Sequence, residues 1–348
     1  MATHSAIATM GIKQPLGLIQ VPTISPTGDE VRVRVEWTAS TPLDLHQNDG
    51  GLLVKHPQVL GDGIAGTVVE VGPLAKRLRV GDGVFGFVWR ESKEKAHQEF
   101  CTTNEWLLAK IPDGFAMAEA VTLPNNFVTV FHAVTTDLGI ELPWPKPVGH
   151  VPRRADDAIL IWGGSSSVGQ FAIQILKCYG HANILTTASK KHHQKLLALG
   201  AKAAFDYSAP DVVGEISQAG PVPFILDCIG SQKGSMAPLS RIATKGAKVA
   251  VLLPVIVRDS SDDEDPIYSM DVAQAVAWDE GVDARGVRTH FYLEPDVMPT
   301  MLRERLVEPN RQRVIEGATL LERAQAAMDA LRRKEASGER LVWRVSEA

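Results

Sequence analysis

The sequence has few cysteines and no long apolar run. Its three cysteines, Cys101, Cys178 and Cys228, lie far apart and form no CxxC pair. This number and spacing exclude a disulfide framework and suit a reducing compartment. No stretch reaches the roughly 18 apolar residues that a membrane-spanning helix needs. The first residues also lack a basic stretch followed by an apolar one. We therefore expect a cytoplasmic protein that has no membrane partner.

Basic residues are not in excess either. The chain has 36 Lys and Arg against 41 Asp and Glu, which gives a formal net charge of −5 and predicts no nucleic-acid partner. It contains no GxSxG motif, so nucleophilic hydrolysis has no support.

Ligands for a catalytic zinc ion are also missing. Such a site needs Cys, His and acidic side chains that converge. Residues 38–48 contain no cysteine, residues 61–63 are Gly-Asp-Gly, and His46 and His56 are isolated histidines. We expect no metal ion, and we leave the catalytic residues unassigned.

The first third of the sequence has the pattern of a small β-rich domain. Residues 31–37 alternate apolar and polar side chains, as a half-buried strand does. Three glycine-punctuated β-branched segments follow at 61–72, 80–88 and 99–112. Such segments predict a compact antiparallel barrel, because glycine permits tight turns and close backbone approach.

After about residue 124 the pattern changes to α/β alternation. A helix is predicted at 125–140, followed by a proline-rich loop at 142–154. Strands and helices then alternate, which predicts a doubly wound parallel sheet of the Rossmann type. The predicted strands are 158–162, 183–188, 203–207, 223–230 and 246–255, and the helices are 168–180 and 192–201. We expect the acidic run 258–268 to be a surface loop, followed by a strand at 287–294, a helix at 320–336 and a strand at 340–345.

The strongest local motif is ILIWGGSSSVGQFAIQIL at 159–176. A buried strand enters a turn of small residues and then a helix, whose first N–H groups lack intrahelical partners and can bind a diphosphate. The GxGxxG pattern is not fully met, because Ser166 stands at the middle glycine position. We predict a dinucleotide-binding turn, and the alternative is an ordinary strand–helix turn. Gly164 aligns with the first glycine of that pattern and Gly169 with the last.

Acidic residues are absent from 184–195, where an NAD site would place a carboxylate for the ribose 2′-OH. The segment instead carries Ser189, Lys190, Lys191 and His192. Hydroxyl and ammonium groups without a carboxylate favour a 2′-phosphate, so we predict NADPH as the cofactor. The alternative is that these lysines only solvate the start of a helix. Hydride delivery without a metal suits an electron-poor acceptor, such as an activated C=C bond or a quinone.

The order of these motifs resembles the quinone oxidoreductase and enoyl reductase branch of the medium-chain dehydrogenase/reductase family, and especially the zinc-independent fungal trans-acting enoyl reductases. The segments that carry the resemblance are TPLDLHQNDG (41–50), VLGDGIAGTVVEVG (59–72), VGDGVFGF (80–87), GGSSSVG (163–169), TASKKHHQKLLALGA (187–201), DYSAP (206–210) and SGERLVWRV (337–345). The resemblance implies a GroES-like substrate domain from residues 1–124 and 286–348, with a Rossmann NADPH-binding domain at 125–285 between them.

The resemblance also implies roles for individual residues. Ser165, Ser166, Ser167 and Val168 would contact the diphosphate, and Thr129 would begin a helix that faces the nicotinamide. Ser189, Lys191 and Tyr207 would bind the 2′-phosphate, with Lys190 and His192 nearby. The nicotinamide would lie beside Thr41, Pro42, Asp44, Thr129, Val251 and Leu252. The sequence departs from the family pattern in three places: Thr41 stands where asparagine is usual, residues 50–54 contain no tyrosine to donate a proton, and residues 295–312 look shorter than usual.

Three functions stay open at this point. The first is an NADPH-dependent reductase of a small-molecule enone, enoyl compound or quinone. The second is a trans-acting enoyl reductase whose substrate is carried by an acyl carrier protein of a synthase. The third is a non-catalytic NADPH-binding protein. We expect a monomer or a homodimer.

Overall fold

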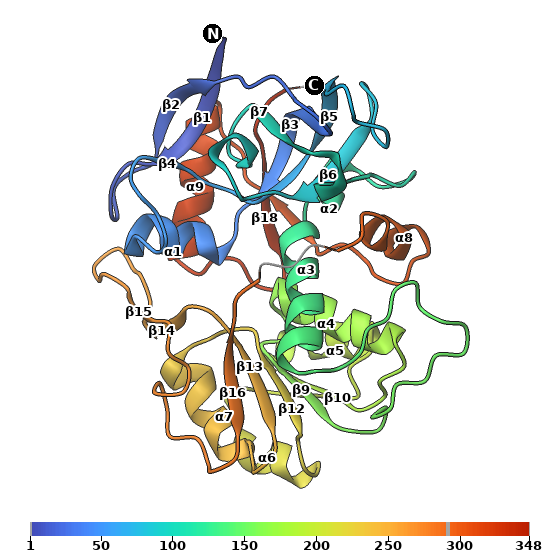
Figure 1. The fold of residues 1–348 in the computed structure, drawn as a ribbon. Helices are drawn as coiled ribbons and strands as arrows, with labels where there is room; N and C mark the ends of the chain where they lie inside the picture. Colours follow the sequence, from blue (N-terminus) through green and yellow to red (C-terminus); the bar gives the residue numbers. More distant parts are fainter. Residues whose placement is uncertain (1, 290–292, 348) are drawn as a thin grey trace. The chain divides into compact units, whose positions relative to one another are not determined.

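The computed structural model describes residues 2–289 and 293–347. Within these residues the chain divides into two compact units (Figure 1). Unit 1 comprises residues 2–125, 260–266 and 293–347, and unit 2 comprises residues 126–259 and 267–289. The chain therefore passes from one unit to the other several times.

Unit 1 consists mainly of β-strands. One sheet has the order β17-β18-β3-β5-β6-β8, with β7 paired to β3, and a second sheet has the order β2-β1-β4. The strands are β1 (Thr3–Thr9), β2 (Gly17–Pro22), β3 (Glu30–Ala39), β4 (Gln58–Val59), β5 (Gly63–Val71), β6 (Gly83–Phe87), β7 (Phe100–Asn104), β8 (Leu108–Lys110), β17 (Gln312–Val314) and β18 (Arg340–Arg344). The helices are α1 (Pro42–Gly50), α2 (Met117–Ala120), α8 (Val297–Arg303) and α9 (Leu320–Arg332), with 3-10 turns at Ser92–Glu94 and Glu105–Leu107.

The glycine-rich segments do form the strands of this sheet, as predicted. Strand β3 buries Val31, Val33 and Val35 on one face, in agreement with its alternating sequence. Gly66 in β5 allows the close approach of β3, because a Cβ atom there would lie 2.1 Å from the Arg34 carbonyl oxygen. The sequence pattern therefore sets both the pairing and the buried face.

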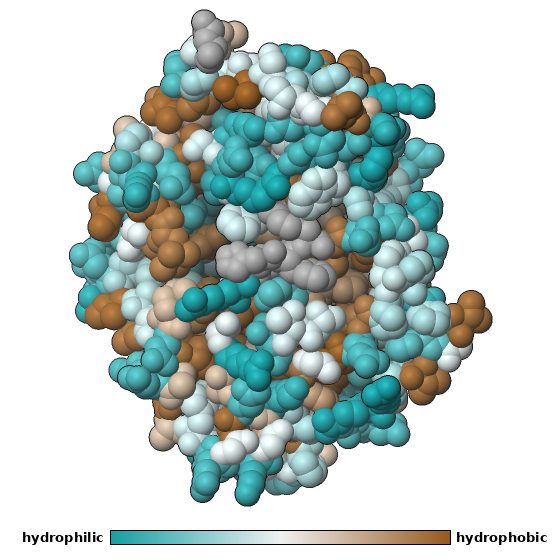
Figure 2. All heavy atoms as spheres, in the orientation of Figure 1, coloured by the Kyte–Doolittle hydropathy of each residue, from teal (hydrophilic) through white to brown (hydrophobic). Residues whose placement is uncertain are grey.

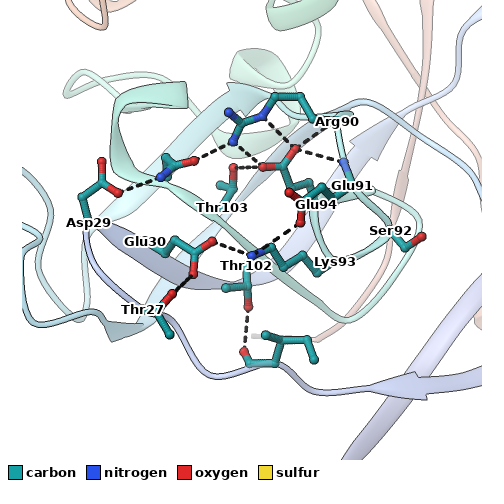
Figure 3. Close-up of polar contacts among 12 residues, drawn as sticks. Thr27, Asp29, Glu30, Arg90, Glu91, Ser92, Lys93, Glu94, Thr102 and Thr103 are labelled. Atoms are coloured by element: carbon teal, nitrogen blue, oxygen red, sulfur yellow. Dashed lines mark hydrogen bonds and ion pairs between the residues drawn. The ribbon is translucent and has the colours of Figure 1, made fainter.

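A polar network fixes the segment that follows β6 (Figure 3). The buried Glu94 carboxylate accepts hydrogen bonds from Arg90 Nη2 at 2.5 Å and from Thr103 Oγ1 at 3.1 Å. Lys93 pairs with Glu30 of β3 at 2.5 Å. Lys93 and Glu94 of the 3-10 turn Ser92–Glu94 are thus held against the sheet, which positions the residues that follow the turn, Lys95 and His97.

Unit 2 is an α/β unit with a six-stranded parallel sheet in the order β11-β10-β9-β12-β13-β16. Counted along the chain this is the order 3-2-1-4-5-6, the arrangement of a Rossmann fold. The strands are β9 (Ile159–Trp162), β10 (Ile184–Thr187), β11 (Ala203–Phe205), β12 (Phe224–Asp227), β13 (Lys248–Leu252) and β16 (Asp283–Val287), with a β14 (Val255–Arg258) and β15 (Ile267–Ser269) hairpin. The helices are α3 (Pro124–His132), which begins two residues before the unit boundary, α4 (Ser167–Cys178), α5 (Lys190–Leu199), α6 (Val212–Gln218) and α7 (Ala237–Ile242). There are π-turns at Ala133–Asp137 and Gln232–Met236.

The acidic run 258–268 lies at the surface as predicted, with its residues 262–265 exposed. Its ends belong to the β14–β15 hairpin, and residues 260–266 between them belong to unit 1. Ser260 is buried and donates to Asp49 Oδ2 at 2.5 Å, and Arg332 at the end of α9 binds both oxygens of the same carboxylate at 2.7 and 2.8 Å. One end of the exposed run is therefore anchored by a hydrogen bond to a buried ion pair.

Other boundaries also differ from the prediction. The strand expected at 287–294 is instead β16, which ends at Val287, and residues 290–292 of that prediction lie outside the described residues. Helices α1, α6, α7 and α8 were not predicted, because each is short and lacks a clear apolar period.

The described part of the chain contains no helix that is both long and apolar enough to cross a lipid bilayer. On the face displayed in Figure 2, hydrophilic and hydrophobic residues are interspersed over short distances. Single exposed apolar residues such as Val148 and Val151 are ordinary features of protein surfaces.

Candidate functional site

The motif at 159–176 forms the predicted strand–turn–helix. Strand β9 ends at Trp162, Gly163 turns the chain with a φ of +86°, and Ser166 caps α4 by accepting a hydrogen bond from the Gly169 N–H at 3.1 Å. We call residues 163–167 the diphosphate turn. Its side chains are half-buried at Ser165, Ser166 and Ser167, so the helix entrance is reachable from outside.

Glycine is required at two positions of this motif. A Cβ atom on Gly164 would lie 1.9 Å from Thr186 Oγ1, and one on Gly169 would lie 2.5 Å from the Gly163 carbonyl oxygen. The backbone is therefore packed directly against its neighbours, and only small side chains stand at the start of α4. This arrangement fits a diphosphate, which binds best at the N-terminus of a helix where backbone approach is unhindered.

Two polar residues that the sequence analysis missed hold the turn in place. Asn126 of α3 donates from Nδ2 to Ser167 Oγ at 2.6 Å, and Gln170 donates from Nε2 to the Ser165 carbonyl oxygen at 2.9 Å. Asn126 lies about 40 residues upstream of the motif, so no local pattern could have connected it to the turn.

The turn also lies where the strand order of the sheet reverses. β9 pairs with β10 on one side and β12 on the other, and ligands of such sheets bind beyond the strand ends at this point. At the end of β12, burial raises the pKa of Asp227 to about 6, although Ser235 donates a hydrogen bond to its carboxylate at 2.6 Å. The other oxygen of Asp227 accepts from the N–H groups of Ile229 and Gly230, so this carboxyl shapes the neighbouring loop.

The predicted 2′-phosphate residues gather beyond β10 and β11. Ser189 is the N-cap of α5, its hydroxyl lies 3.5 Å from the Tyr207 hydroxyl, and Lys190 and Lys191 are exposed in the first turn. His192 is half-buried, and burial followed by the charge of Lys191 lowers its pKa. Residues 189–192 and Tyr207 thus meet on one edge of unit 2.

A carboxylate that the sequence analysis did not weigh lies at the same edge. Asp206 follows β11 and is half-buried, and Ser208, more than Lys190 or His193, lowers its pKa. The charges of Lys190 and His193 nevertheless act on it. Residues 184–195 contain no acidic side chain. The edge formed by residues 189–192 and Tyr207, which we call the cationic edge, nevertheless contains one carboxylate from the neighbouring strand.

The remaining predicted residues divide between the units. In unit 2, Val251 is buried and Leu252 half-buried at the end of β13. Thr129 lies in the middle of α3 and accepts a hydrogen bond from Thr289 at 3.4 Å, so the expectation that it begins the helix was wrong. The helix begins at Pro124 instead, since proline suits the first helical position.

In unit 1, Thr41 and Asp44 form the start of α1. The Thr41 side chain accepts from the Asp44 N–H, the Asp44 carboxylate accepts from the Thr41 N–H at 2.8 Å, and Pro42 stands in the first turn. This is a capping box, which fixes the direction of the helix and of these side chains.

Asp44 also belongs to a buried ionic cluster that the sequence analysis missed. The cluster consists of Asp44, Asp62, Lys95, His97 and Arg340, which come from α1, the start of β5, the chain after the 3-10 turn, and β18. Burial raises the pKa of Asp44 to about 6, and burial together with the Asp44 charge raises the pKa of Asp62 to about 7. Four separate segments supply it, so only the fold reveals the cluster.

Metal ligands are not assembled in the described residues. Across 2–289 and 293–347, no three His, Cys, Asp or Glu side chains group closely enough to hold a metal ion.

Two family profiles match the chain. Residues 27–133 match the alcohol dehydrogenase GroES-like domain, and residues 167–263 match the zinc-binding dehydrogenase profile. Together they cover more than half of the sequence.

Known proteins resemble the chain as well. It is 33% identical over 208 residues to the trans-enoyl reductase himH of Aspergillus japonicus, which covers 58% of this chain and 59% of that protein. It is 28% identical over 343 residues to the trans-enoyl reductase pvhC of Talaromyces variabilis, with 90% of each covered. The match to himH thus spans about three fifths of that relative's length. The structure of the quinone oxidoreductase from Coxiella burnetii superposes with a TM-score of 0.78 at 21% identity, covering 99% of this chain and 100% of that one.

These findings agree with the architecture of both units. The chain belongs to the medium-chain dehydrogenase/reductase family, a family of oxidoreductases with a GroES-like domain and a Rossmann domain.

Proposed function

We propose that the protein is an NADPH-dependent, zinc-independent reductase of activated C=C bonds, in enones or enoyl compounds, or of quinones. The observation that carries this proposal is the diphosphate turn together with the cationic edge that contains Ser189, Lys190 and Lys191. Both lie at the carboxyl ends of neighbouring parallel strands, β9 and β10. We assign residues 125–285 to NADPH binding, and 1–124 with 286–348 to the substrate domain.

Each part of the proposed cofactor site has a physical reason. The N–H groups at the start of α4 and the hydroxyls of Ser165 and Ser166 would bind the diphosphate. Lys190 and Lys191 would supply charge-assisted hydrogen bonds to the 2′-phosphate, with Ser189, Tyr207 and His192 beside them. When bound, NADPH supplies a hydride equivalent. Val251, Leu252 and Thr129, together with Thr41, Pro42 and Asp44, are the proposed nicotinamide neighbours.

Calorimetry and absorbance test this proposal. NADPH should bind to the purified protein at least about tenfold more tightly than NADH, because the two cofactors differ only in the 2′-phosphate. A panel of enones, enoyl thioesters and quinones should then cause loss of NADPH absorbance. No NADPH binding, or a preference for NADH, would refute the cofactor assignment. Tight binding without consumption by any acceptor would favour a non-catalytic NADPH-binding protein.

The relatives favour one variant of this function. Several are named trans-enoyl reductases, which suggests that the substrate is an enoyl group carried by the acyl carrier protein of a synthase. Comparison of a carrier-bound enoyl thioester with the same acyl group on a short thiol separates the two variants. A kcat/KM at least about tenfold higher for the carrier-bound form would support the carrier partner. Equal values would support a small-molecule substrate.

A further inference from the structure

Two buried carboxyl groups, Asp44 and Asp62, stand at the centre of the ionic cluster. Asp44 is well supplied with donors, because its oxygens accept from the Thr41 N–H at 2.8 Å, the Thr41 hydroxyl at 3.4 Å and the Gly61 N–H at 3.2 Å. Hydrogen bonds of this kind stabilise the ionised form of a carboxyl group. Asp44 is therefore the member of the pair that retains its negative charge.

Asp62 has a different environment. It is only 5% exposed, one of its oxygens accepts from the Asn125 side-chain amide, and the other, Oδ1, has no hydrogen-bond partner among the described residues. A buried carboxylate oxygen without a hydrogen-bond donor is unfavourable. When the carboxyl group is protonated at this oxygen, it can donate a hydrogen bond or a proton to a bound molecule. The environments of the two carboxyl groups thus favour ionisation of Asp44 and protonation of Asp62. A general acid and a neighbouring carboxylate need such a difference.

Several charged groups among the described residues act on the pair. Asp44 from α1 repels a charge on Asp62, whereas Lys95 and Arg340 attract one. His97 lies 4.0 Å from Asp44, and burial lowers its pKa to about 3, so it stays neutral. Burial also lowers the pKa of Lys95 and Arg340. Burial of Asp62 and the charge of Asp44 outweigh the attraction of the two cations, so Asp62 keeps a proton near neutral pH.

We propose that Asp62 is the proton donor of the reduction, an inference that rests on the proposed function. The segment 41–44, which we propose to lie beside the nicotinamide, is joined to Asp62 through the Gly61–Asp44 hydrogen bond. Asp62 therefore lies in the same part of unit 1 as Thr41, Pro42 and Asp44, the proposed nicotinamide neighbours of this unit. No tyrosine is needed at 50–54 when this carboxyl supplies the proton.

When bound, the reduced nicotinamide would supply a hydride equivalent to the β-carbon of the conjugated substrate, and the C=C electron pair would move onto the carbonyl oxygen as an enolate. The O–H bond of Asp62 breaks, its proton forms a C–H bond with the α-carbon using the enolate electron pair, and Asp62 is left as a carboxylate. Water then returns a proton to Asp62, so that each turnover consumes one hydride and one proton.

The first test needs no cofactor. Among the resonances of aspartate labelled with ¹³C at the carboxyl carbon, that of Asp62 should titrate at the highest pH, near 7, above those of Asp44 and Asp227. Asp62→Asn should remove this resonance, and the matched control Asp113→Asn, an exposed residue outside the cluster, should retain it. Retention of the resonance in Asp62→Asn would overturn the assignment.

The second test follows the reaction. An acid must be protonated to act, so the wild-type rate should fall as pH rises through about 7. Asp62→Asn should lose about 100-fold in kcat and this pH dependence, with NADPH affinity unchanged. In D₂O the wild type should place deuterium on one face of the α-carbon, and Asp62→Asn should place it on both faces. A purely structural role would not change the labelling.

The outcomes separate the two proposals. If the wild type consumes NADPH and Asp62→Asn retains its rate, pH profile and labelling, Asp62 is not the donor although the proposed function stands. If the wild type consumes no NADPH with any acceptor, the proposed function and the proton-donor role fall together. The thermal unfolding of Asp62→Asn, compared with that of Asp113→Asn, shows whether the variant is folded. If it is folded, a lower rate reflects loss of the proton donor.

Discussion

The diphosphate turn and the ionic cluster are both polar, but they are built in opposite ways. The turn is one continuous segment at the end of β9 that offers backbone N–H groups and hydroxyls. The cluster buries ionisable side chains from α1, β5, the segment after β6 and β18. The turn depends on the absence of side chains at Gly164 and Gly169, and the cluster depends on the balance of charges in a place without water.

This difference suggests distinct sensitivities. A site of backbone donors should tolerate pH change and fail when the backbone is displaced. A site of buried charges should tolerate small displacements of the backbone, but it should lose stability when one charged partner is removed. Four substitutions test these sensitivities, in order of decreasing effect. They lie in the diphosphate turn, in a second buried ion pair of unit 1, and at the cationic edge.

Gly169→Val should have the largest effect. Its Cβ would lie 2.5 Å from the Gly163 carbonyl oxygen, so the turn or the start of α4 must move. We expect NADPH affinity to fall at least about 100-fold by calorimetry. The control Gly83→Ala, where a Cβ would meet only Met117 Cε at 3.7 Å, should bind normally. Normal binding by Gly169→Val would show that the turn does not depend on backbone geometry.

Arg332→Ala should lower the stability of unit 1, because it removes one partner of the buried ion pair between Arg332 and Asp49. It leaves Asp49 buried with only Ser260 and Asn48 as side-chain donors. We expect a loss of about 3 kcal/mol in the free energy of unfolding, measured by denaturant titration.

The pH dependence sharpens the Arg332 test. Burial opposes ionisation of Asp49, but its hydrogen bonds, from Arg332 above all, lower its pKa. Its contribution to stability is therefore present above the unfolded pKa of about 4 and is lost as pH falls. The difference in the free energy of unfolding between the wild type and Arg332→Ala should become smaller below that pH. A gap that is constant with pH would contradict this explanation.

Lys191→Ala should weaken NADPH binding about tenfold and leave NADH binding unchanged, because only NADPH has a 2′-phosphate. Lys202→Ala is the matched control, since Lys202 hydrogen-bonds Asn183 at 3.1 Å instead. An equal loss for both cofactors would mean that Lys191 acts on another part of the molecule.

Asp206→Asn should have the smallest effect and the opposite sign. Removing a carboxylate near Lys190 should strengthen NADPH binding about twofold at low salt. Raising the salt concentration should abolish the difference. Weaker binding would indicate that Asp206 orients the cationic edge instead of repelling the phosphate.

Much of unit 2 could be predicted from the sequence, because its elements are local. The strands β9 and β10 and the helices α4 and α5 lie within a few residues of their predicted positions, since buried strands and glycine-ended helices leave contiguous patterns. The strand–turn–helix at the diphosphate turn was predictable for the same reason. The NADPH preference itself stays a prediction.

Long-range features could not be predicted. Asn126 reaches Ser167 across 41 positions, and Asp62 meets Asp44 only because Gly61 folds back onto α1. Asp206 was missed because it follows a neighbouring strand, beyond the segment that was examined for acids. Side chains that meet through tertiary pairing leave no periodic trace in one sequence.

The position of β18 affects how the protein is made. This strand lies between β17 and β3, and its Trp343 is fully buried with its indole N–H donated to Ser40 at 2.9 Å. On the ribosome, β3 emerges some 300 residues before its neighbour does, whereas the strands of unit 2 follow one another closely. The edge of β3 at residues 37–39, which pairs with β18, therefore lacks its partner strand through most of translation and can pair with other chains in that time.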